Sequence, residues 1–298
     1  MSTLKILRNR IQSVKSTRKI TSAMKLVACS YFKKAEHLLI KARPYARGVA
    51  DSLDAVLKLQ ESKEVDVSLL TGGKGPVCLL ILIAGNRGLC GGFNMNVGRH
   101  ANKRIRELLD QNKTLKILGL GTKCLLGLHR DYMPLVEETM DLNEINGVEK
   151  IGMLCSKIAG RIQAKEIDEC AVLYSSFRSV MSSSIETHSL IPFKKDITLN
   201  SKKFAPTLGE KPSPLLFGVE PDMKAVLDSL TFENLKAQLY FALKESLASE
   251  HSARMMAMEN ATKNAKEMLE KLEITYHRTR QYSITKELIE IVAGAEAI

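Results

Sequence analysis

The sequence has little of what a thick globular core is usually built from: tryptophan is absent, and aromatic residues make up only 5% of the chain. Large aromatic side chains dominate the packing of many cores, so this composition favours narrow seams between helices. No apolar run reaches the roughly eighteen residues that a membrane-spanning helix requires. The first ten residues lack the apolar stretch of a secretory signal, so we expect the protein to stay where it is made, or to have lost a presequence.

Motifs for metal binding and catalysis are also missing. The cysteines show no CxxC pair, and the histidines show no HExxH or other ligand spacing. The serine run at 182–184 lies in a strand-like segment rather than in a GxSxG turn. We therefore expect reduced, buried cysteines and no catalytic residue, metal site or cofactor. The six cysteines are Cys29, Cys78, Cys90, Cys124, Cys155 and Cys170.

Residues 222–298 contain no proline and a single glycine, Gly294. Good helix formers dominate this segment, and an unbroken helix of this length would extend for about 115 Å. Its apolar residues recur at spacings of three and four, which is typical of a coiled-coil seam that needs a partner helix. The predicted seam comprises Leu235, Leu239, Leu243, Ala261, Ala265, Met268, Leu272, Ile284, Leu288, Ile291 and Ala295.

Acidic residues are nearly absent from residues 1–47, which hold twelve Lys or Arg against the single acid Glu36. The rest of the chain is balanced, so the net charge of +11 comes from this N-terminal arm. We predict that the arm forms a helix up to Pro44 and that this helix resumes beyond the proline. It is expected to pair antiparallel with the C-terminal helix. Its apolar stripe starts with Leu4, Leu7, Ile11 and Val14 and then shifts to Ile20, Met24, Val27, Tyr31, Ala35 and Leu38.

The middle of the chain has the order of a parallel α/β sheet. Strands are expected at 77–84, 115–121, 169–177 and 180–193, with helices ending near Leu109 and spanning 148–163. Residues 196–221 are polar and rich in proline, and we interpret them as a linker. The predicted class is α/β: a long antiparallel coiled coil of N- and C-terminal helices plus a Rossmann-like parallel-sheet domain. The predicted domains are 1–60, 61–215 and 216–298.

A glycine-rich segment, GNRGLCGGFN at 85–94, directly follows the first strand. Such a loop can hold a phosphate, but its spacing matches neither GxGxxG nor the P-loop, and a structural turn is the simpler interpretation. Two other functions stay open from the residues alone. The basic arm is compatible with a coiled-coil nucleic-acid-binding protein, although no recognised motif is present. The middle domain is compatible with a dinucleotide-dependent enzyme.

Four segments carry a resemblance to a known family. Residues 4–28 and 284–297 resemble the two end signatures of the gamma subunit of rotary, F-type ATP synthases, and 88–94 and 253–272 resemble its other recurring blocks. Three residues depart from the family pattern: Asn86 stands where Asp is usual, Lys263 where Asp is frequent, and Tyr282 where a smaller residue is usual. These departures bear on local packing only.

The resemblance implies a non-catalytic central-stalk rotor, one copy per complex, inside a ring of three alpha and three beta subunits. It would rest on the epsilon subunit and the c-subunit ring, and would couple proton flow to conformational cycling of catalytic sites on beta. The implied location is the cytoplasmic face of the bacterial inner membrane or the matrix face of the mitochondrial one, with membrane association only through the complex. No nucleic acid is expected to bind.

The resemblance also implies which residues face the catalytic ring. In the N-terminal arm these are Arg18, Lys19, Met24 and Lys25, which match a region beside acidic loops of the beta subunits. In the C-terminal helix they are Arg280, Gln281, Thr285 and Glu287. The N-terminal arm is shorter than the C-terminal helix, so we expect the second group to lie where the partner helix ends.

Overall fold

A computed structural model describes residues 2–59, 68–73, 75–145, 147–193 and 222–296. These residues form two compact units: one holds the chain up to Ser30 and from Arg254 onward, and the other is Tyr31–Ala253. Both expected domain boundaries, near 60 and 216, and the expected linker lie outside the described residues. Within the described part of the chain, no helix combines enough length and apolar character to cross a membrane.

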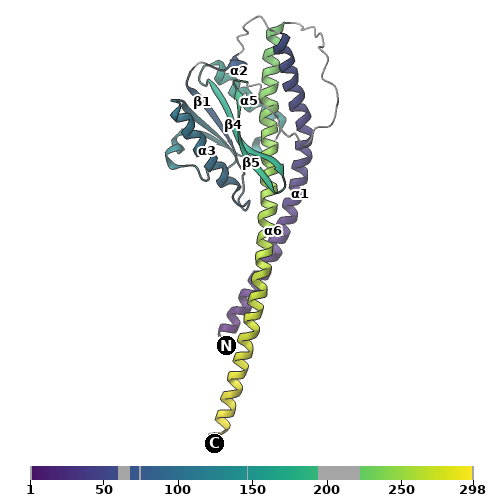
Figure 1. Cartoon of the computed structure of the whole chain (residues 1–298), viewed down its shortest axis with the longest axis vertical. Coiled ribbons are helices and arrows are strands. Elements are labelled where there is room, and N and C mark those ends of the chain that lie inside the picture. Colours follow the sequence, from purple (N-terminus) through teal and green to yellow (C-terminus); the bar gives the residue numbers. More distant parts are fainter. Residues whose placement is uncertain (1, 60–67, 74, 146, 194–221, 297–298) are drawn as a thin grey trace. The chain divides into compact units, whose positions relative to one another are not determined.

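The unit formed by the chain ends is a pair of helices. One comes from α1 (Ser2–Leu59) and the other from α6 (Met223–Glu296). The two helices are antiparallel, because residues that come earlier in α1 contact residues that come later in α6: Lys25 pairs with Glu259, Thr21 with Thr262, and Lys15 with Glu273. The predicted antiparallel coiled coil is therefore confirmed (Figure 1).

The inner face of α1 differs from the predicted one. The less exposed residues keep one unbroken alternation of three and four, and no shift of the stripe occurs. The expected residues Ile20, Met24, Val27, Tyr31 and Leu38 are instead 39–59% exposed. The prediction was wrong here because three inner positions are polar and their partners lie on α6, which the pattern of α1 alone does not reveal. The inner residues are Leu4, Leu7, Ile11, Val14, Arg18, Thr21, Lys25, Ala28, Phe32, Ala35, Leu39, Ala42 and Ala46.

The inner face of α6 was predicted in part. Leu235, Leu239 and Leu243 are buried, and so is Ala265. Met268 is 46% exposed, whereas its neighbour Leu269 is 4% exposed and takes the inner position. The spacing from Met258 through Thr262, Ala265 and Leu269 again alternates between four and three, so position 269 rather than 268 faces α1.

Helix α1 passes through Pro44 without ending, whereas the sequence predicted a break. A proline inside a helix removes one backbone hydrogen bond and costs about 3 kcal/mol. Packing on both sides of Pro44 offsets this cost: Ala42 and Ala46 join a buried cluster with Phe241. Next to the proline, the Tyr45 hydroxyl donates a hydrogen bond to Glu233 at 2.9 Å.

The second unit contains a five-stranded sheet in the order β3-β2-β1-β4-β5. The first four strands are mutually parallel, and β5 runs antiparallel to β4. The predicted strands are present, although the antiparallel direction of β5 was not foreseen. The strands are β1 (Val77–Ile83), β2 (Thr114–Leu120), β3 (Val136–Met140), β4 (Glu169–Ser179) and β5 (Ser182–Ile191).

Helices cover both faces of this sheet. One face packs on α3 (Phe93–Asp110) through alternate β1 residues such as Leu80 and Leu82. The other packs on α5 (Val148–Gln163), on Leu53 of α1 and on α6 through Leu79, Ile81 and Ile83. Since β1 is buried on both faces, its continuous apolar run is explained. The short elements are α2 (Ser68–Thr71), η1 (Arg130–Leu135) and α4 (Leu142–Ile145).

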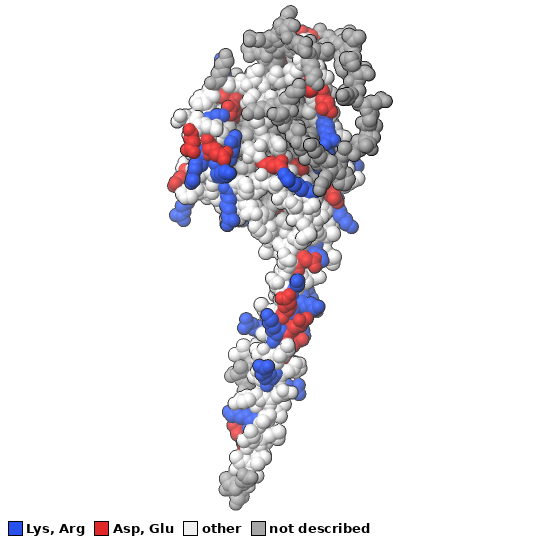
Figure 2. All heavy atoms as spheres, in the orientation of Figure 1, with Lys and Arg blue, Asp and Glu red and all other residues white. Residues whose placement is uncertain are grey.

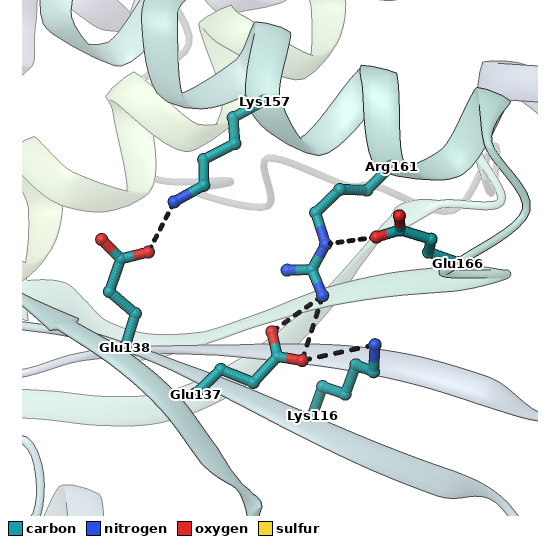
Figure 3. Close-up of polar contacts among 6 residues, drawn as sticks. All are labelled: Lys116, Glu137, Glu138, Lys157, Arg161 and Glu166. Atoms are coloured by element: carbon teal, nitrogen blue, oxygen red, sulfur yellow. Dashed lines mark hydrogen bonds and ion pairs between the residues drawn. The ribbon is translucent and has the colours of Figure 1, made fainter.

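Strand β3 was missed by the sequence analysis because its segment, VEETM, is mostly polar. Its two glutamates are held by side chains from α5 and β2 (Figure 3). Arg161 contacts Glu137 at 2.8 Å, Lys116 contacts it at 3.3 Å, and Lys157 contacts Glu138 at 2.6 Å. Burial alone would raise the pKa of Glu137, but hydrogen bonds from Arg161 and Lys116 lower it. Ion pairs thus stabilise an edge strand that has little apolar surface.

Candidate functional surface

The helix pair has a polar section in the middle of its seam. The hydroxyl oxygens of Thr21 and Thr262 lie 2.9 Å apart, so one donates to the other across the two helices. On either side of them, Lys25 pairs with Glu259, and Lys15 contacts Glu273 at 2.9 Å. The Lys15 ammonium lowers the pKa of Glu273 by a hydrogen bond and by its charge. Polar residues in a seam fix which residues face each other, at some cost in stability.

Of the four predicted contact residues of α1, two lie in the seam and two lie on the outer surface. Arg18 and Lys25 occupy inner positions, and Lys25 is already paired with Glu259. Lys19 and Met24 are exposed on the outer surface. Along the helix pair, Figure 2 shows Lys and Arg side chains interspersed with Asp and Glu, so part of the excess charge of the arm is compensated within the unit.

The paired section of α6 ends near Ser283. From there to residue 295 every described side chain is exposed, including Ile284 at 45%, Leu288 at 57% and Ile291 at 68%. Most of the spheres towards this end of α6 are accordingly white in Figure 2. Thr285 lines a shallow apolar groove here with Leu288, Ile289, Val292 and Ala293. This surface has no partner among the described residues of the chain.

The predicted contact residues of α6 lie around the start of this unpaired section. Arg280, Gln281 and Glu287 are exposed. The hydroxyl of Ser283 donates to Glu287 at 3.3 Å. Ile289 and Val292 were not among the residues predicted from the sequence. The signal was available, because apolar residues at 284, 288, 289, 291 and 292 make a surface that is too wide for a two-helix seam.

The second unit contains buried ionisable groups on α6. Burial raises the pKa of Glu245 to about 7, against the opposing effects of a hydrogen bond from Tyr174, the charge of Arg43 and the backbone N–H of Phe177. Burial also raises the pKa of Tyr174 well above its usual value. Within the described ranges, no group of three or more His, Cys, Asp or Glu side chains is arranged to hold a metal ion.

None of the six cysteines, all of which lie in the described part of the chain, forms a disulfide, and five are buried, as predicted. Cys29 is the exception, because it is only partly buried. Burial raises the pKa of Cys78 and Cys124 to about 11 and that of Cys155 to about 12.

The three departures from the family pattern have local explanations. Asn86 donates to the Asp141 carboxylate at 2.5 Å, and its own oxygen accepts from the backbone of Thr122 and Leu142. An aspartate at position 86 would place a second carboxylate against Asp141, so the amide suits this neighbour. Lys263 and Tyr282 are exposed, and larger or charged side chains fit there without rearrangement.

Comparisons with known proteins match the whole chain. A family model described as ATP synthase matches residues 3–298. The ATP synthase gamma chain of Sinorhizobium medicae is 39% identical, and that of Granulibacter bethesdensis 41%, each over 100% of both chains.

Solved structures share the fold. A chain of the Euglena gracilis mitochondrial ATP synthase, from an assembly titled OSCP/F1/c-ring, superimposes with a TM-score of 0.66 at 18% identity, covering 99% of this chain and 94% of that one. A chain from the central stalk and c-ring of the Tetrahymena thermophila enzyme gives a TM-score of 0.57 at 24% identity, covering 81% and 99%. At such identities the superpositions establish the fold, and the full-length relatives establish the family. The chain belongs to the ATP synthase gamma chain family.

Proposed function

We propose that this chain is the central-stalk rotor subunit of a proton-translocating ATP synthase. It couples proton flow through a membrane ring to the conformational cycle of catalytic beta subunits. The chain itself carries no catalytic role in this proposal. The observation that carries the proposal is the unpaired end of α6, where apolar residues from Ile284 to Val292 are exposed and contact no other element among the residues that the structure describes. An apolar surface of this kind indicates an interaction site, and a family member would place it inside the ring of catalytic subunits.

The partners in this proposal are three alpha and three beta subunits, an epsilon subunit and a c-subunit ring, with one copy of this chain per complex. The protein would associate with the membrane only through the complex, at the cytoplasmic face of a bacterial inner membrane. Full-length relatives from bacteria support the bacterial alternative over the mitochondrial one.

Weak contacts suit a shaft that passes three identical partners in turn. A rotor can shift the equilibrium between two conformations of a catalytic subunit only if its contacts with the two conformations differ in free energy. Lys19 and Met24 are exposed for such contacts, whereas Arg18 and Lys25 occupy inner positions in the polar section of the seam. Exposed ion pairs contribute about 0–1 kcal/mol each, so no single pair would hold the rotor in one position.

The test uses the assembled complex with Arg280 and Gln281 both replaced by alanine. Both side chains are exposed at the start of the unpaired section, so their loss removes contacts with the ring without disturbing the helix pair. We expect ATP turnover by the complex to fall, while the helicity of the isolated subunit, measured by circular dichroism, stays unchanged.

The matched control is Lys266→Ala with Glu267→Ala, two exposed neighbours on the paired section of α6. This control should keep turnover near the wild-type value. If the Arg280 and Gln281 variant lost helicity in step with turnover, the two residues would serve folding and the proposed contact would be wrong.

A further inference from the structure

The carboxyl end of the parallel sheet is occupied by helix α6. In open α/β sheets, ligands usually bind in the crevice outside the carboxyl ends of the strands, where the strand order reverses. Here the chain proceeds from β1 outward to β2 and β3 and then returns to place β4 on the other side of β1. The reversal point therefore lies between the ends of β1 and β4.

Four buried polar residues of α6 face this edge of the sheet. Glu245, Ser249, Glu250 and Ser252 are each at most 5% exposed, although serine and glutamate usually face solvent. They fall within eight consecutive positions, and all of them belong to the unit of Tyr31–Ala253. Such a concentration of buried polar groups needs partners, and the sheet provides them.

The contacts of these residues tie α6 to the end of β4 and to the turn that follows it. The Ser249 hydroxyl donates to the backbone oxygen of Ser175 at 3.1 Å. The Ser252 hydroxyl donates to that of Val180 at 2.6 Å. Glu245 accepts hydrogen bonds from the Tyr174 hydroxyl and from the backbone of the same strand. Figure 1 shows the β4–β5 hairpin lying against α6 in this region.

Glu250 reaches the other side of the reversal point, at the glycine-rich loop. A methyl group at position 85 would lie 2.7 Å from the Glu250 carboxylate, so only glycine allows this approach. The backbone N–H of Gly85 donates to the Asn94 side chain at 2.9 Å, and Asn94 lies in the first turn of α3. A strand, a glycine-rich loop and the start of a helix are the parts that hold phosphate in nucleotide-binding sheets. Here they enclose a carboxylate of the same chain.

We propose that α6 takes the place of a ligand in this crevice, and that Ser249 and Glu250 form the joint through which torque passes between the sheet and the helix. The inference rests on the rotor function proposed above and adds the residues that carry the load. An apolar contact is non-directional, whereas hydrogen bonds depend steeply on angle. The buried hydrogen bonds of Ser249 and Ser252 to the sheet therefore resist twisting, and the close approach of Glu250 to Gly85 adds a second point of contact. Beyond the joint, α6 continues to Glu296 without proline.

The test uses the full complex reconstituted into vesicles, with the variants Ser249→Ala, Glu250→Gln and both together. Two quantities are measured: ATP hydrolysis with an uncoupler present, and the steady pH gradient that ATP hydrolysis builds without one. The gradient loads the joint, whereas the uncoupler relieves it. We expect unloaded hydrolysis to stay at the wild-type rate, and the gradient of the double variant to fall about twofold or more.

The matched control is Glu270→Gln with Thr275→Ala, which also removes one carboxylate and one hydroxyl from exposed positions of α6. Its gradient should equal that of the wild type. The joint is overturned if the double variant builds a normal gradient, or if gradient and unloaded hydrolysis fall in proportion, because loss of assembled complex alone produces that result. Should the double variant fail to assemble, Ser249→Ala decides by the same two readings. If the wild-type vesicles build no gradient that depends on this chain, the rotor function itself fails, and not the joint alone.

Discussion

Glu245 shows how one buried side chain makes the stability of the protein depend on pH. Its carboxyl group is 5% exposed on α6, and burial raises its pKa to about 7 from an ordinary value of 4.5. The ionisable groups around it come from three elements: Arg43 on α1 and Glu186 on β5 act through their charges, and the hydroxyl of Tyr174 on β4 donates a hydrogen bond. The folded protein therefore holds a proton on Glu245 at pH values where the unfolded chain has released it.

The folded state binds more protons between about pH 4.5 and pH 7, so the free energy of unfolding falls as the pH rises through this window. A shift of this size corresponds to roughly 3 kcal/mol. Glu245→Gln cannot titrate and should lose this component. We expect urea unfolding to show the wild type gaining stability relative to the variant on going from pH 8 to pH 4.5.

An exposed amide on the same helix provides the control. Asn260→Ala removes no titratable group and should give a difference from the wild type that does not change across the same pH range. Parallel pH profiles for the wild type and Glu245→Gln would mean that Glu245 does not carry the proton assigned to it.

At the scale of the element, the seam of the helix pair can be tested with two adjacent residues. Leu269 is 4% exposed against α1, whereas Met268 is 46% exposed. Leu269→Ala should lower the free energy of unfolding by about 2–4 kcal/mol, because it removes buried methyl groups and leaves a cavity. Met268→Ala should change it by no more than about 0.5 kcal/mol. Thermal unfolding followed by circular dichroism distinguishes the two, and equal effects would refute the placement of the seam.

The elements were predictable wherever apolar residues alone define them. Strand β1 and helix α5 were placed correctly because their apolar residues carry the periodicity of a buried strand and of a one-sided helix. Strand β3 was not found, because Glu137 and Glu138 are held by ion pairs with residues distant in the sequence. Ion pairs between separate segments leave no local pattern, so sequence periodicity cannot find them.

The candidate surface was also predictable only in part, because polar residues at inner positions leave no pattern in the sequence. The resemblance to the family pointed to residues 280–287, and the greater length of α6 indicated that its partner would end there. The inner positions of Arg18, Thr21 and Lys25 were not foreseen, because polar residues are usually taken to mark the outer face of a helix. Only the partner residues Glu259 and Thr262, more than two hundred positions away, make an inner place acceptable for Lys25 and Thr21.

At the scale of the whole molecule, the cysteines report on folding. Cys29 is partly buried, the other five are buried, and raised pKa values keep the thiols of Cys78, Cys124 and Cys155 protonated at neutral pH. Thiolate is the reactive form. A maleimide at pH 7 should therefore label the native protein once, at Cys29, and the unfolded protein six times. Mass spectrometry counts the labels, and Cys29→Ala should remain unlabelled in the native state. Labelling of a second cysteine without unfolding would contradict the burial described here.

The antiparallel pairing of α1 with α6 also determines how the protein is made. The inner residues of α1 from Ala35 to Ala46 pack on Ala237, Phe241 and Ala248, which lie about two hundred residues further along the chain. At a synthesis rate of 5–20 residues per second, the ribosome needs roughly 10–40 s to produce that partner after α1 has emerged. During this interval the apolar residues of α1 lack the helix that covers them in the folded protein. The pairing of the two helices can therefore be completed only after synthesis of the last segment of the chain.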